Sequence, residues 1–206
     1  MSTGAAAAPQ MRWRPYVPVL VKLLSAVCMG ILLGLSLTLF VVERRMGFGT
    51  IELGAWRGLP RAGTPLDPYT RAALAYSGET PLSASDAITF IAREDSTRRA
   101  LTPFCDYSIS GDLPAARYWT LTLLTPAGAP APNLSGRAGF TSSEVLRASG
   151  GTFQITVSRH ARPGNWLPAG EGAFVLVLRL YDSELAANSG PLAEASMPRI
   201  ARGRCG

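Results

Sequence analysis

The longest apolar stretch of the chain lies near its N-terminus. Residues 23–42, LLSAVCMGILLGLSLTLFVV, contain no charged side chain. A helix of that length matches the hydrocarbon core of a bilayer, which is roughly 30 Å thick. Lys22 on one side and Arg44 and Arg45 on the other put cations at the level of the lipid headgroups. The pattern predicts a transmembrane helix over residues 16–42, retained because no small-residue cleavage site follows it.

Alternating apolar and polar positions recur in the second half of the chain. The segments CDYSIS (105–110), RYWTLTLLT (117–125) and TFQITVS (152–158) alternate with a period of two, as half-buried strands do. The segment AFVLVLRLY (173–181) is apolar on both faces up to Arg179, which predicts a strand covered on both sides. Turns rich in Gly and Pro separate these segments, a spacing typical of a β-sandwich or barrel.

Two segments between the apolar helix and these strands are less regular. LDPYTRAALAYSG (66–78) begins with an Asp-Pro pair that suits a helix N-terminus and ends with a glycine, so it predicts a short helix. LSASDAITFIAREDS (82–96) has two interpretations. Ser83 with Asp86 has the spacing of a helix capping box, whereas AITFIA alternates like a strand.

These patterns divide the chain of 206 residues into four parts. We expect a flexible cytoplasmic tail over residues 1–15, the transmembrane helix over 16–42, a juxtamembrane connector over 43–66 and a mainly β domain over 67–206. Within the connector, Trp56 is expected at the membrane interface, where an amphipathic ring is favoured. Apolar residues make up 47% of the chain and charged residues 17%, which excludes a disordered protein.

The formal net charge of +6 is concentrated beside the apolar helix. Beyond Met46 the chain has 15 arginines against 13 acidic residues, a net charge of +2. No run of basic residues is interleaved with aromatic ones, so we expect no nucleic-acid partner. The cations near the helix instead predict contact with the lipid bilayer.

The orientation of the helix follows from the cysteines rather than from the flanking charges. Three basic residues on the N-terminal side and four on the C-terminal side do not decide it. Cys105 and Cys205 are the only cysteines outside the helix, and two cysteines in an exported domain suggest one disulfide. This predicts a cytoplasmic N-terminus and a periplasmic domain. Two unpaired thiols in a cytoplasmic domain are the alternative.

Several longer segments together resemble one bacterial family. They are DPYTRAALA, CDYSISGDLPAARYWTLTL, APN before Arg137, RPGNWLPAGEGAFVLVLRLYD and MPRIARGRC. Over residues 67–205 the chain resembles the family of domain of unknown function 1214. The resemblance implies a single-span inner-membrane protein with a jelly-roll-like β-sandwich, makes AITFIA a strand and supports the disulfide. It implies no established activity.

The sequence offers little for catalysis. His160 is the only histidine, and Ser142, Ser143, Asp182 and Glu184 could complete a triad, but no G-x-S-x-G motif is present. The acidic residues available for a glycosidase pair are Asp106, Asp112, Glu144 and Asp182, yet nothing in the sequence places two of them together. Ligand spacing for a metal and glycine-rich phosphate loops are also absent. We therefore predict no catalytic residue, no metal and no cofactor.

The remaining candidate site consists of aromatic, amide and guanidinium side chains. Planar rings stack on sugars or apolar groups, while Asn and Arg orient polar atoms, so these residue types are typical of a ligand groove. The alternative is that the same residues hold the fold, with NWLP as a structural corner. The candidates are Trp119, Asn133, Arg137, Asn165, Trp166, Arg179 and Tyr181.

The sequence therefore favours a membrane-anchored, non-catalytic module that binds an envelope protein or glycan. An envelope hydrolase and a structural subunit of an inner-membrane complex are the alternatives. Gly30 and Gly34 have the spacing that allows a second helix to approach closely, which predicts self-association. A concave pocket with His160 beside a nucleophile would favour the enzyme. A flat face or a packed core would favour the module.

Overall fold

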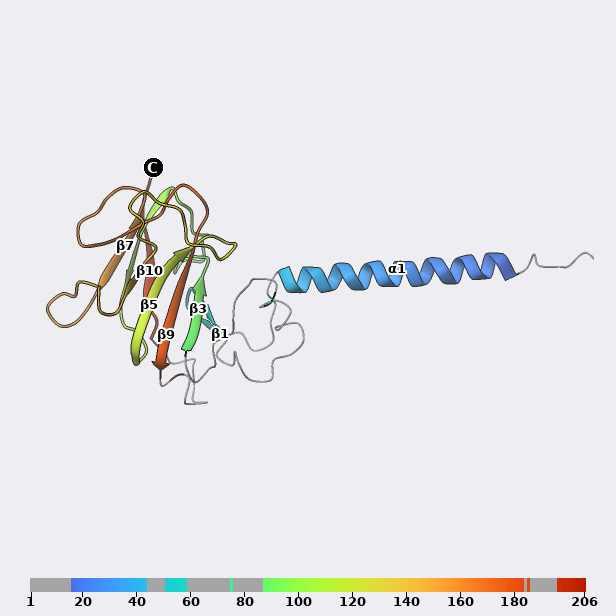
Figure 1. The fold of residues 1–206 in the computed structure, drawn as a ribbon, viewed down its shortest axis with the longest axis horizontal. Helices are drawn as coiled ribbons and strands as arrows, with labels where there is room; N and C mark the ends of the chain where they lie inside the picture. The colour runs from blue at the N-terminus through green and yellow to red at the C-terminus, as the bar shows by residue number, and fades with distance from the viewer. Residues whose placement is uncertain (1–15, 44–50, 59–74, 76–86, 184, 186–195) are drawn as a thin grey trace, which may run out of the picture. The chain divides into compact units, whose positions relative to one another are not determined.

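A computed structural model gives the architecture of the chain (Figure 1). The described residues are 16–43, 51–58, 75, 87–183, 185 and 196–206. They belong to two compact units, an N-terminal helix and a β-domain, and each is described by itself. The protein is mainly β, as predicted.

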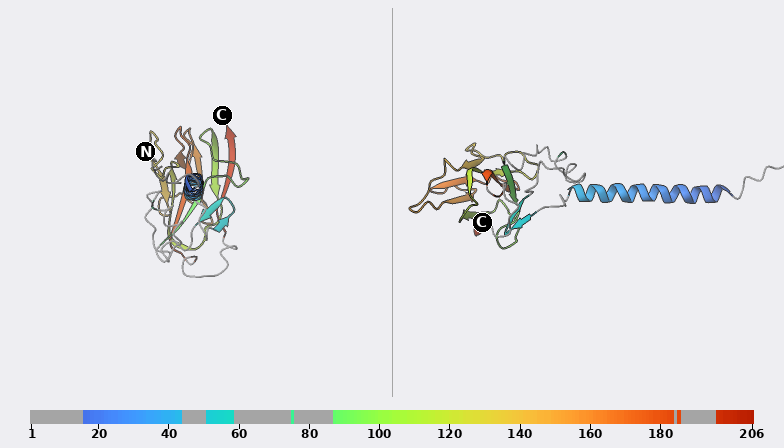
Figure 2. Two further views of the ribbon diagram at one scale, coloured as in Figure 1. Left: turned by 90° about the vertical axis from the view of Figure 1, so that its right-hand side faces the viewer. Right: turned by 90° about the horizontal axis from the view of Figure 1, so that it is seen from below.

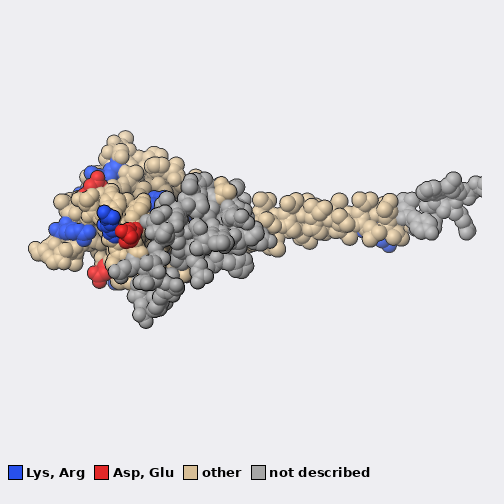
Figure 3. All heavy atoms as spheres, turned by 60° about the horizontal axis from the view of Figure 1, so that its bottom comes forward, with Lys and Arg blue, Asp and Glu red and all other residues tan. Residues whose placement is uncertain are grey.

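Helix α1 (Tyr16–Glu43) is the apolar segment predicted from the sequence. Its part Pro18–Val41 has a mean hydropathy of 2.3 and is exposed along its length. Figure 3 shows an almost uncharged helix surface. The helix is long and apolar enough to cross a membrane, and a signal sequence would satisfy the same criteria. A Cβ added to Gly30 or Gly34 would meet no atom within 4 Å, and self-association through them stays a prediction.

The larger of the two sheets in the β-domain has six strands in the order β1-β2-β3-β9-β5-β6, all antiparallel to their neighbours. Two long strands, β9 and β5, form its centre and pair over eight residue positions. The strands are β1 (Ile51–Leu53), β2 (Trp56–Gly58), β3 (Ala87–Ala92), β5 (Ala116–Leu124), β6 (Gly139–Thr141) and β9 (Val175–Ser183).

The smaller sheet has four strands in the order β10-β4-β7-β8. The pair of β7 with β8 is parallel, and the other two pairs are antiparallel. The strands are β4 (Cys105–Ser110), β7 (Gln154–Ser158), β8 (Asn165–Pro168) and β10 (Arg199–Cys205). Figure 2 shows both groups of strands from two further sides.

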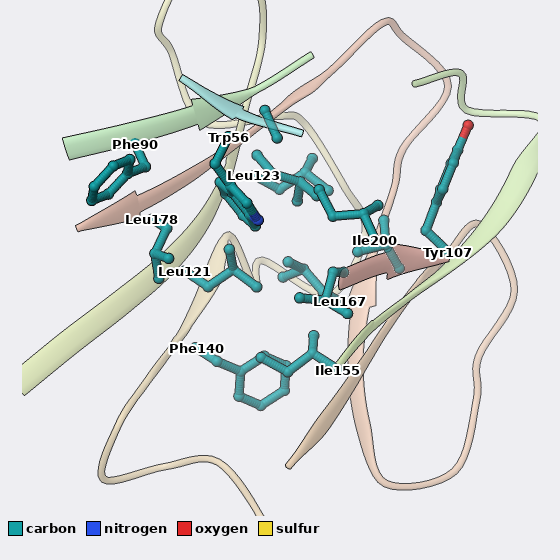
Figure 4. Packing of buried hydrophobic residues seen from close by; sticks show 14 of the residues in the cluster. Trp56, Phe90, Tyr107, Leu121, Leu123, Phe140, Ile155, Leu167, Leu178 and Ile200 are labelled. Carbon is teal, nitrogen blue, oxygen red and sulfur yellow. The ribbon is translucent and has the colours of Figure 1, made fainter. Parts of the chain in front are cut away.

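A single hydrophobic core lies between the two sheets. Leu121 and Leu178 come from the larger sheet, and Ile155 and Ile200 come from the smaller one (Figure 4). All four side chains have an exposed fraction of 1% or less. Because each sheet buries one face against the other, the β-domain is a two-layer sandwich, which confirms the predicted fold class.

The alternation read from the sequence matches the observed burial. In β5 the side chains of Trp119, Leu121 and Leu123 are buried, while the positions between them are only partly buried. In β9 the leucines enter the core, and Val175 and Val177 on the opposite face are buried as well. The ambiguous segment AITFIA is strand β3, as the family resemblance implied. Of the short helix predicted over residues 66–78, only Ala75 lies within the described residues.

Trp56 corrects one prediction. It was expected at the membrane interface, but its side chain is 1% exposed and lies in the core of the β-domain. Its indole Nε1 donates a hydrogen bond of 2.7 Å to the carbonyl of Pro198, 142 positions away in the sequence. The strands β1 and β2 lie inside the predicted connector over 43–66. This part of the range belongs to the larger sheet because β2 pairs with β3.

A group that we call the C-terminal clasp, formed by Asp95, Cys105, Tyr107, Arg202 and Cys205, ties β10 to the rest of the domain. Cys105 and Cys205 form a disulfide across the pair of β4 and β10, as predicted. The Arg202 guanidinium lies 5.4 Å from the centroid of the Tyr107 ring. Its Nε donates to the fully buried carboxylate of Asp95 at 2.7 Å.

The carboxylate of Asp95 is held by four hydrogen bonds. One oxygen accepts from the backbone N–H and the hydroxyl of Thr97 at 2.8 and 2.6 Å and from the N–H of Arg99 at 3.1 Å. The other oxygen accepts from Arg202. Burial by itself would raise the pKa of Asp95, but these hydrogen bonds outweigh burial and hold the pKa well below its usual value.

Candidate functional site

The cavity of interest in the β-domain lies where the β4–β5 loop faces a hairpin between β6 and β7. It has a volume of about 300 Å³ and is lined by residues 111–116, Trp119, Arg147 and residues 150–153. We call it the Trp119 cleft. Its volume is at the lower end of the range of small-molecule sites.

Two aromatic rings lie together at this cleft. Trp119 is held by β5, and its ring centroid lies 5.2 Å from that of Phe153, with the planes tilted by 35°. Both side chains are mostly buried, with exposed fractions of 5% for Trp119 and 7% for Phe153. Because their edges still line the cavity, they give it an apolar, rigid wall.

The hairpin positions Arg147 at the cleft. Arg147 and Phe153 form an isolated antiparallel bridge, and Ala148 N–H donates to the carbonyl of Thr152 at 2.8 Å. Gly150 and Gly151 lie between them with φ angles of 99° and 83°, which glycine adopts without strain. The guanidinium of Arg147 stands 5.9 Å from the centroid of the Phe153 ring and donates to the carbonyl of Gly151 at 2.8 Å.

The chain matches one family model. Residues 86–185 match the model described as a protein of unknown function (DUF1214). These residues belong to the DUF1214 family. The match runs from the start of β3 to the end of β9, so the helix, β1, β2 and β10 lie outside it. The resemblance expected from the sequence is confirmed, and the family is one of unknown function.

Two solved structures are similar to this chain. The crystal structure of the VPA0106 protein from Vibrio parahaemolyticus superposes with a TM-score of 0.58 at 19% identity, covering 95% of this chain and 47% of that one. An uncharacterized protein from Burkholderia cenocepacia gives a TM-score of 0.42 at 16% identity, with coverage of 81% and 39%. The chain thus spans about half the length of the first structure, and the likeness shows the fold alone. No curated protein matches the chain.

Of the predicted ligand residues in the DUF1214 domain, only Trp119 lines this cleft. Asn165 and Trp166 lie on β8 of the smaller sheet, where they bond to backbone. The amide of Asn165 donates to the carbonyls of Leu146 and Gln154 at 2.8 and 2.9 Å, and its oxygen accepts from the Leu146 N–H at 2.7 Å. Trp166 Nε1 donates to the carbonyl of Ser158 at 2.9 Å.

Asn133 and Arg137 lie in the loop between β5 and β6. The amide of Asn133 donates to the carbonyls of Ala131 and Arg137 at 3.0 Å each, and its oxygen accepts from the Arg137 N–H at 3.2 Å. The guanidinium of Arg137 lies 4.7 Å from the centroid of the Phe140 ring. The described contacts of both residues are therefore local, and Asn133 holds its own turn as asparagine commonly does.

Arg179 and Tyr181 lie on the face of the larger sheet that points away from the core. Their neighbours Leu178 and Leu180 on β9 fill the core, so the odd-numbered positions face outward. The Tyr181 ring lies 5.8 Å from that of Tyr118, its partner on β5. The seven predicted residues are thus spread over both sheets and a loop, and they do not form one site.

Among the residues that the structure describes, those around His160 do not form a catalytic triad, and the candidate Glu184 lies outside the described residues. The backbone N–H of His160 donates to Ser158 Oγ at 3.1 Å, and this serine is fully buried and bonds to Asp106 directly rather than through an imidazole. Burial alone would raise the pKa of Asp106, but the Ser158 and Arg162 hydrogen bonds and the Arg162 and His160 charges lower it. A triad needs the imidazole between the two groups.

Ser142, one of the two serines considered as nucleophiles from the sequence, lies beside the larger sheet. Its hydroxyl accepts a hydrogen bond of 3.4 Å from the backbone N–H of Trp119. The described parts of the chain contain no group of three His, Cys, Asp or Glu side chains placed to hold a metal ion.

Sequence reasoning missed Arg147 and Phe153, and it considered Asp112 only as an acidic residue for a glycosidase pair; these three side chains give the cleft the rest of its chemistry. A sequence signal was available in RASGGTF, where two adjacent glycines separate an arginine from a phenylalanine. Such a pattern predicts a tight hairpin that brings the two flanking side chains together.

Proposed function

We propose that this protein is a single-pass membrane protein of the bacterial inner membrane, with its N-terminus in the cytoplasm and its β-domain in the periplasm. The exposed apolar surface of Pro18–Val41 supports the anchor, because such a surface is stable only in lipid. The disulfide between Cys105 and Cys205 supports the periplasmic location, because disulfides persist in oxidising compartments.

We further propose that the β-domain binds an envelope ligand or protein partner without chemical conversion. The observation that carries this proposal is the Trp119 cleft, which combines an aromatic wall with the charged groups of Arg147 and Asp112. Its described lining contains no histidine, cysteine or serine and only one carboxylate, Asp112, so it has neither a serine or cysteine beside a histidine nor the two carboxylates of a glycosidase. The envelope hydrolase considered from the sequence gains no support from this geometry.

Anchoring gives such a module a physical advantage. A domain tied to the bilayer samples only a thin layer of solvent, so its effective concentration relative to other membrane-bound molecules is high. Weak binding in a small cleft is then sufficient for frequent occupation.

A reporter fusion tests the location. An alkaline phosphatase joined after Gly206 should be active in cells, since that enzyme needs an oxidising compartment, and a green fluorescent protein at the same position should be dark. A fluorescent fusion with an inactive phosphatase would contradict the periplasmic assignment.

Site-directed photocrosslinking tests the binding role. A photoreactive phenylalanine analogue at Thr152 would lie in the cleft lining, and the same analogue at Leu134 would be fully exposed in the β5–β6 loop, outside that lining. We expect crosslinked products in native membranes from position 152 and none from position 134. Equal products from both positions, or none from either, would contradict binding at the cleft.

A further inference from the structure

The walls of the Trp119 cleft carry opposite charges. Asp112 belongs to the β4–β5 loop, and Arg147 belongs to the hairpin that faces this loop. Both side chains are exposed. Within the described chain, Asp112 and Arg147 form no ion pair with each other or with any other residue. The guanidinium of Arg147 donates one described hydrogen bond, to the Gly151 carbonyl, so most of its five N–H donors are open to a ligand.

Asp112 and Arg147 line one cavity but form no ion pair with each other. Among the other described acidic side chains of the domain, five lie within 4.0 Å of a guanidinium, and Glu94 and Glu144 do not. The two charges of the cleft are instead held apart on opposite loops across a cavity. The lining therefore offers one anionic and one cationic contact with a net charge of zero.

Trp119 adds a hydrogen-bond donor to the aromatic wall of the cleft. Its indole N–H donates to no described acceptor, yet no side-chain nitrogen or oxygen of the described chain is both buried and unpaired. This N–H therefore reaches solvent, and the Trp119 cleft is the cavity that this side chain lines. Together with Arg147 it provides two donors suited to a carboxylate, beside the apolar edges of Phe153 and Leu113.

We propose that the cleft binds a zwitterion of the amino-acid class with an apolar side chain. The carboxylate contacts Arg147 and the Trp119 N–H, the ammonium group contacts Asp112, and the apolar side chain packs against Phe153. This inference rests on the proposed binding function and specifies its ligand chemistry. A purely anionic ligand would meet the Asp112 carboxylate and a purely cationic one would meet the Arg147 guanidinium, so each single charge leaves one repulsive contact.

Four matched compounds test the proposal on the full-length, ¹⁵N-labelled protein in detergent micelles. L-phenylalanine carries both charges, 3-phenylpropionate only the negative one, 2-phenylethylamine only the positive one, and 2-phenylethanol none. Binding is measured from the chemical shifts of the Gly150 and Gly151 amides and of the Trp119 indole N–H. We expect L-phenylalanine to bind about tenfold more tightly than either singly charged compound, which corresponds to about 1.4 kcal/mol.

Two substitutions should separate the two charges. Arg147→Gln should remove the advantage of L-phenylalanine over 2-phenylethylamine, and Asp112→Asn should remove its advantage over 3-phenylpropionate. The matched controls are Arg204→Gln and Glu171→Gln, which change exposed charges outside the cleft lining and should leave all four affinities unchanged.

The outcomes distinguish this inference from the function on which it rests. If the four compounds bind equally, or if one singly charged compound binds best, the zwitterion inference is overturned while the cleft remains a binding site. If none of the four, including neutral 2-phenylethanol, shifts the three reporter signals, both the ligand class and the binding role of the cleft are overturned.

Discussion

The C-terminal clasp and the Trp119 cleft both combine charged and aromatic side chains, but they differ in how completely their polar groups are paired. In the clasp, Asp95 is fully buried and accepts four hydrogen bonds. In the cleft, Asp112 and Arg147 are exposed and lack ion-pair partners within the described chain. Residue types alone therefore do not separate a structural cluster such as the clasp from the proposed binding site.

The difference follows from the free energy of leaving polar groups unpaired. A buried charge without a partner costs several kcal/mol, so the fold satisfies Asp95 completely. An exposed charge is satisfied by water and can exchange that water for a ligand at little cost. Paired groups thus indicate stability, and open groups around a cavity indicate binding. The following predictions test this distinction, from the largest expected effect to the smallest.

The largest effect is expected from the disulfide of the clasp. It connects residues 100 positions apart, and for a closed loop of that size the chain-entropy model gives about 4–5 kcal/mol of stabilisation. Replacing both Cys105 and Cys205 by Ser should lower the free energy of unfolding by that amount, measured by urea titration of the full-length protein in micelles. Cys28→Ser, a change at an exposed thiol of α1, is the control and should have no effect.

The buried ion pair of the clasp should give the next largest effect. Asp95→Ala would leave the guanidinium of Arg202, which is 13% exposed, without its anionic partner. Removal of one member of a buried pair typically destabilises a protein by about 3–5 kcal/mol. The same urea titration measures the loss. Glu171→Ala removes an exposed partner of Arg159 and should change stability by less than about 0.5 kcal/mol. Equal losses for the two variants would mean that the clasp contributes no more than a surface pair.

The clasp should also make stability depend on pH. The pKa of Asp95 in the folded protein lies below its unfolded value, which is about 3.9. Its contribution is therefore complete above the unfolded pKa and is lost as the pH falls through the folded pKa. The urea midpoint of unfolding should begin to decrease as the pH falls below about 5 and should keep decreasing well below pH 3.9 in the wild-type protein. It should decrease more gently in Asp95→Asn. Parallel curves for the two proteins would show that other carboxylates, such as Asp106, dominate.

The sequence predicted those parts of the fold that depend on local pattern. The apolar run near the N-terminus gave α1, and period-two alternation gave β4, β5 and β7 with the correct buried faces. The segment that is apolar on both faces gave β9, which is buried on both faces as predicted. The prediction failed at Trp56, where three-residue strands carry too little pattern to be recognised. Trp56 is fixed instead by pairing with β3 and by a hydrogen bond to Pro198, and neither long-range contact is visible in the sequence around it.

The candidate site was less predictable because tertiary structure assembles it. Trp119 was identified from its residue type, but Asp112 and Arg147 lie 35 positions apart and meet at one cavity only in the folded chain. Asn165 was also predicted as a ligand residue from its residue type, yet its side-chain amide is hydrogen-bonded to backbone groups of Leu146 and Gln154. Hydrogen-bond pairing, which distinguishes them, is a property of the fold.

The smallest effect on stability is expected in the cleft, and this result would sharpen the comparison most. Arg147→Gln and Asp112→Asn alter exposed groups that form no described ion pair, so each should change the free energy of unfolding by less than about 0.5 kcal/mol. The urea titration used for the clasp variants measures this, with Arg204→Gln as a matched surface control. A loss above about 1 kcal/mol would place these charges with Asp95 as supports of the fold. Unchanged stability would mean that the hairpin holds its shape without them, as its backbone bonds and paired glycines suggest, and that the two charges are free to serve a ligand.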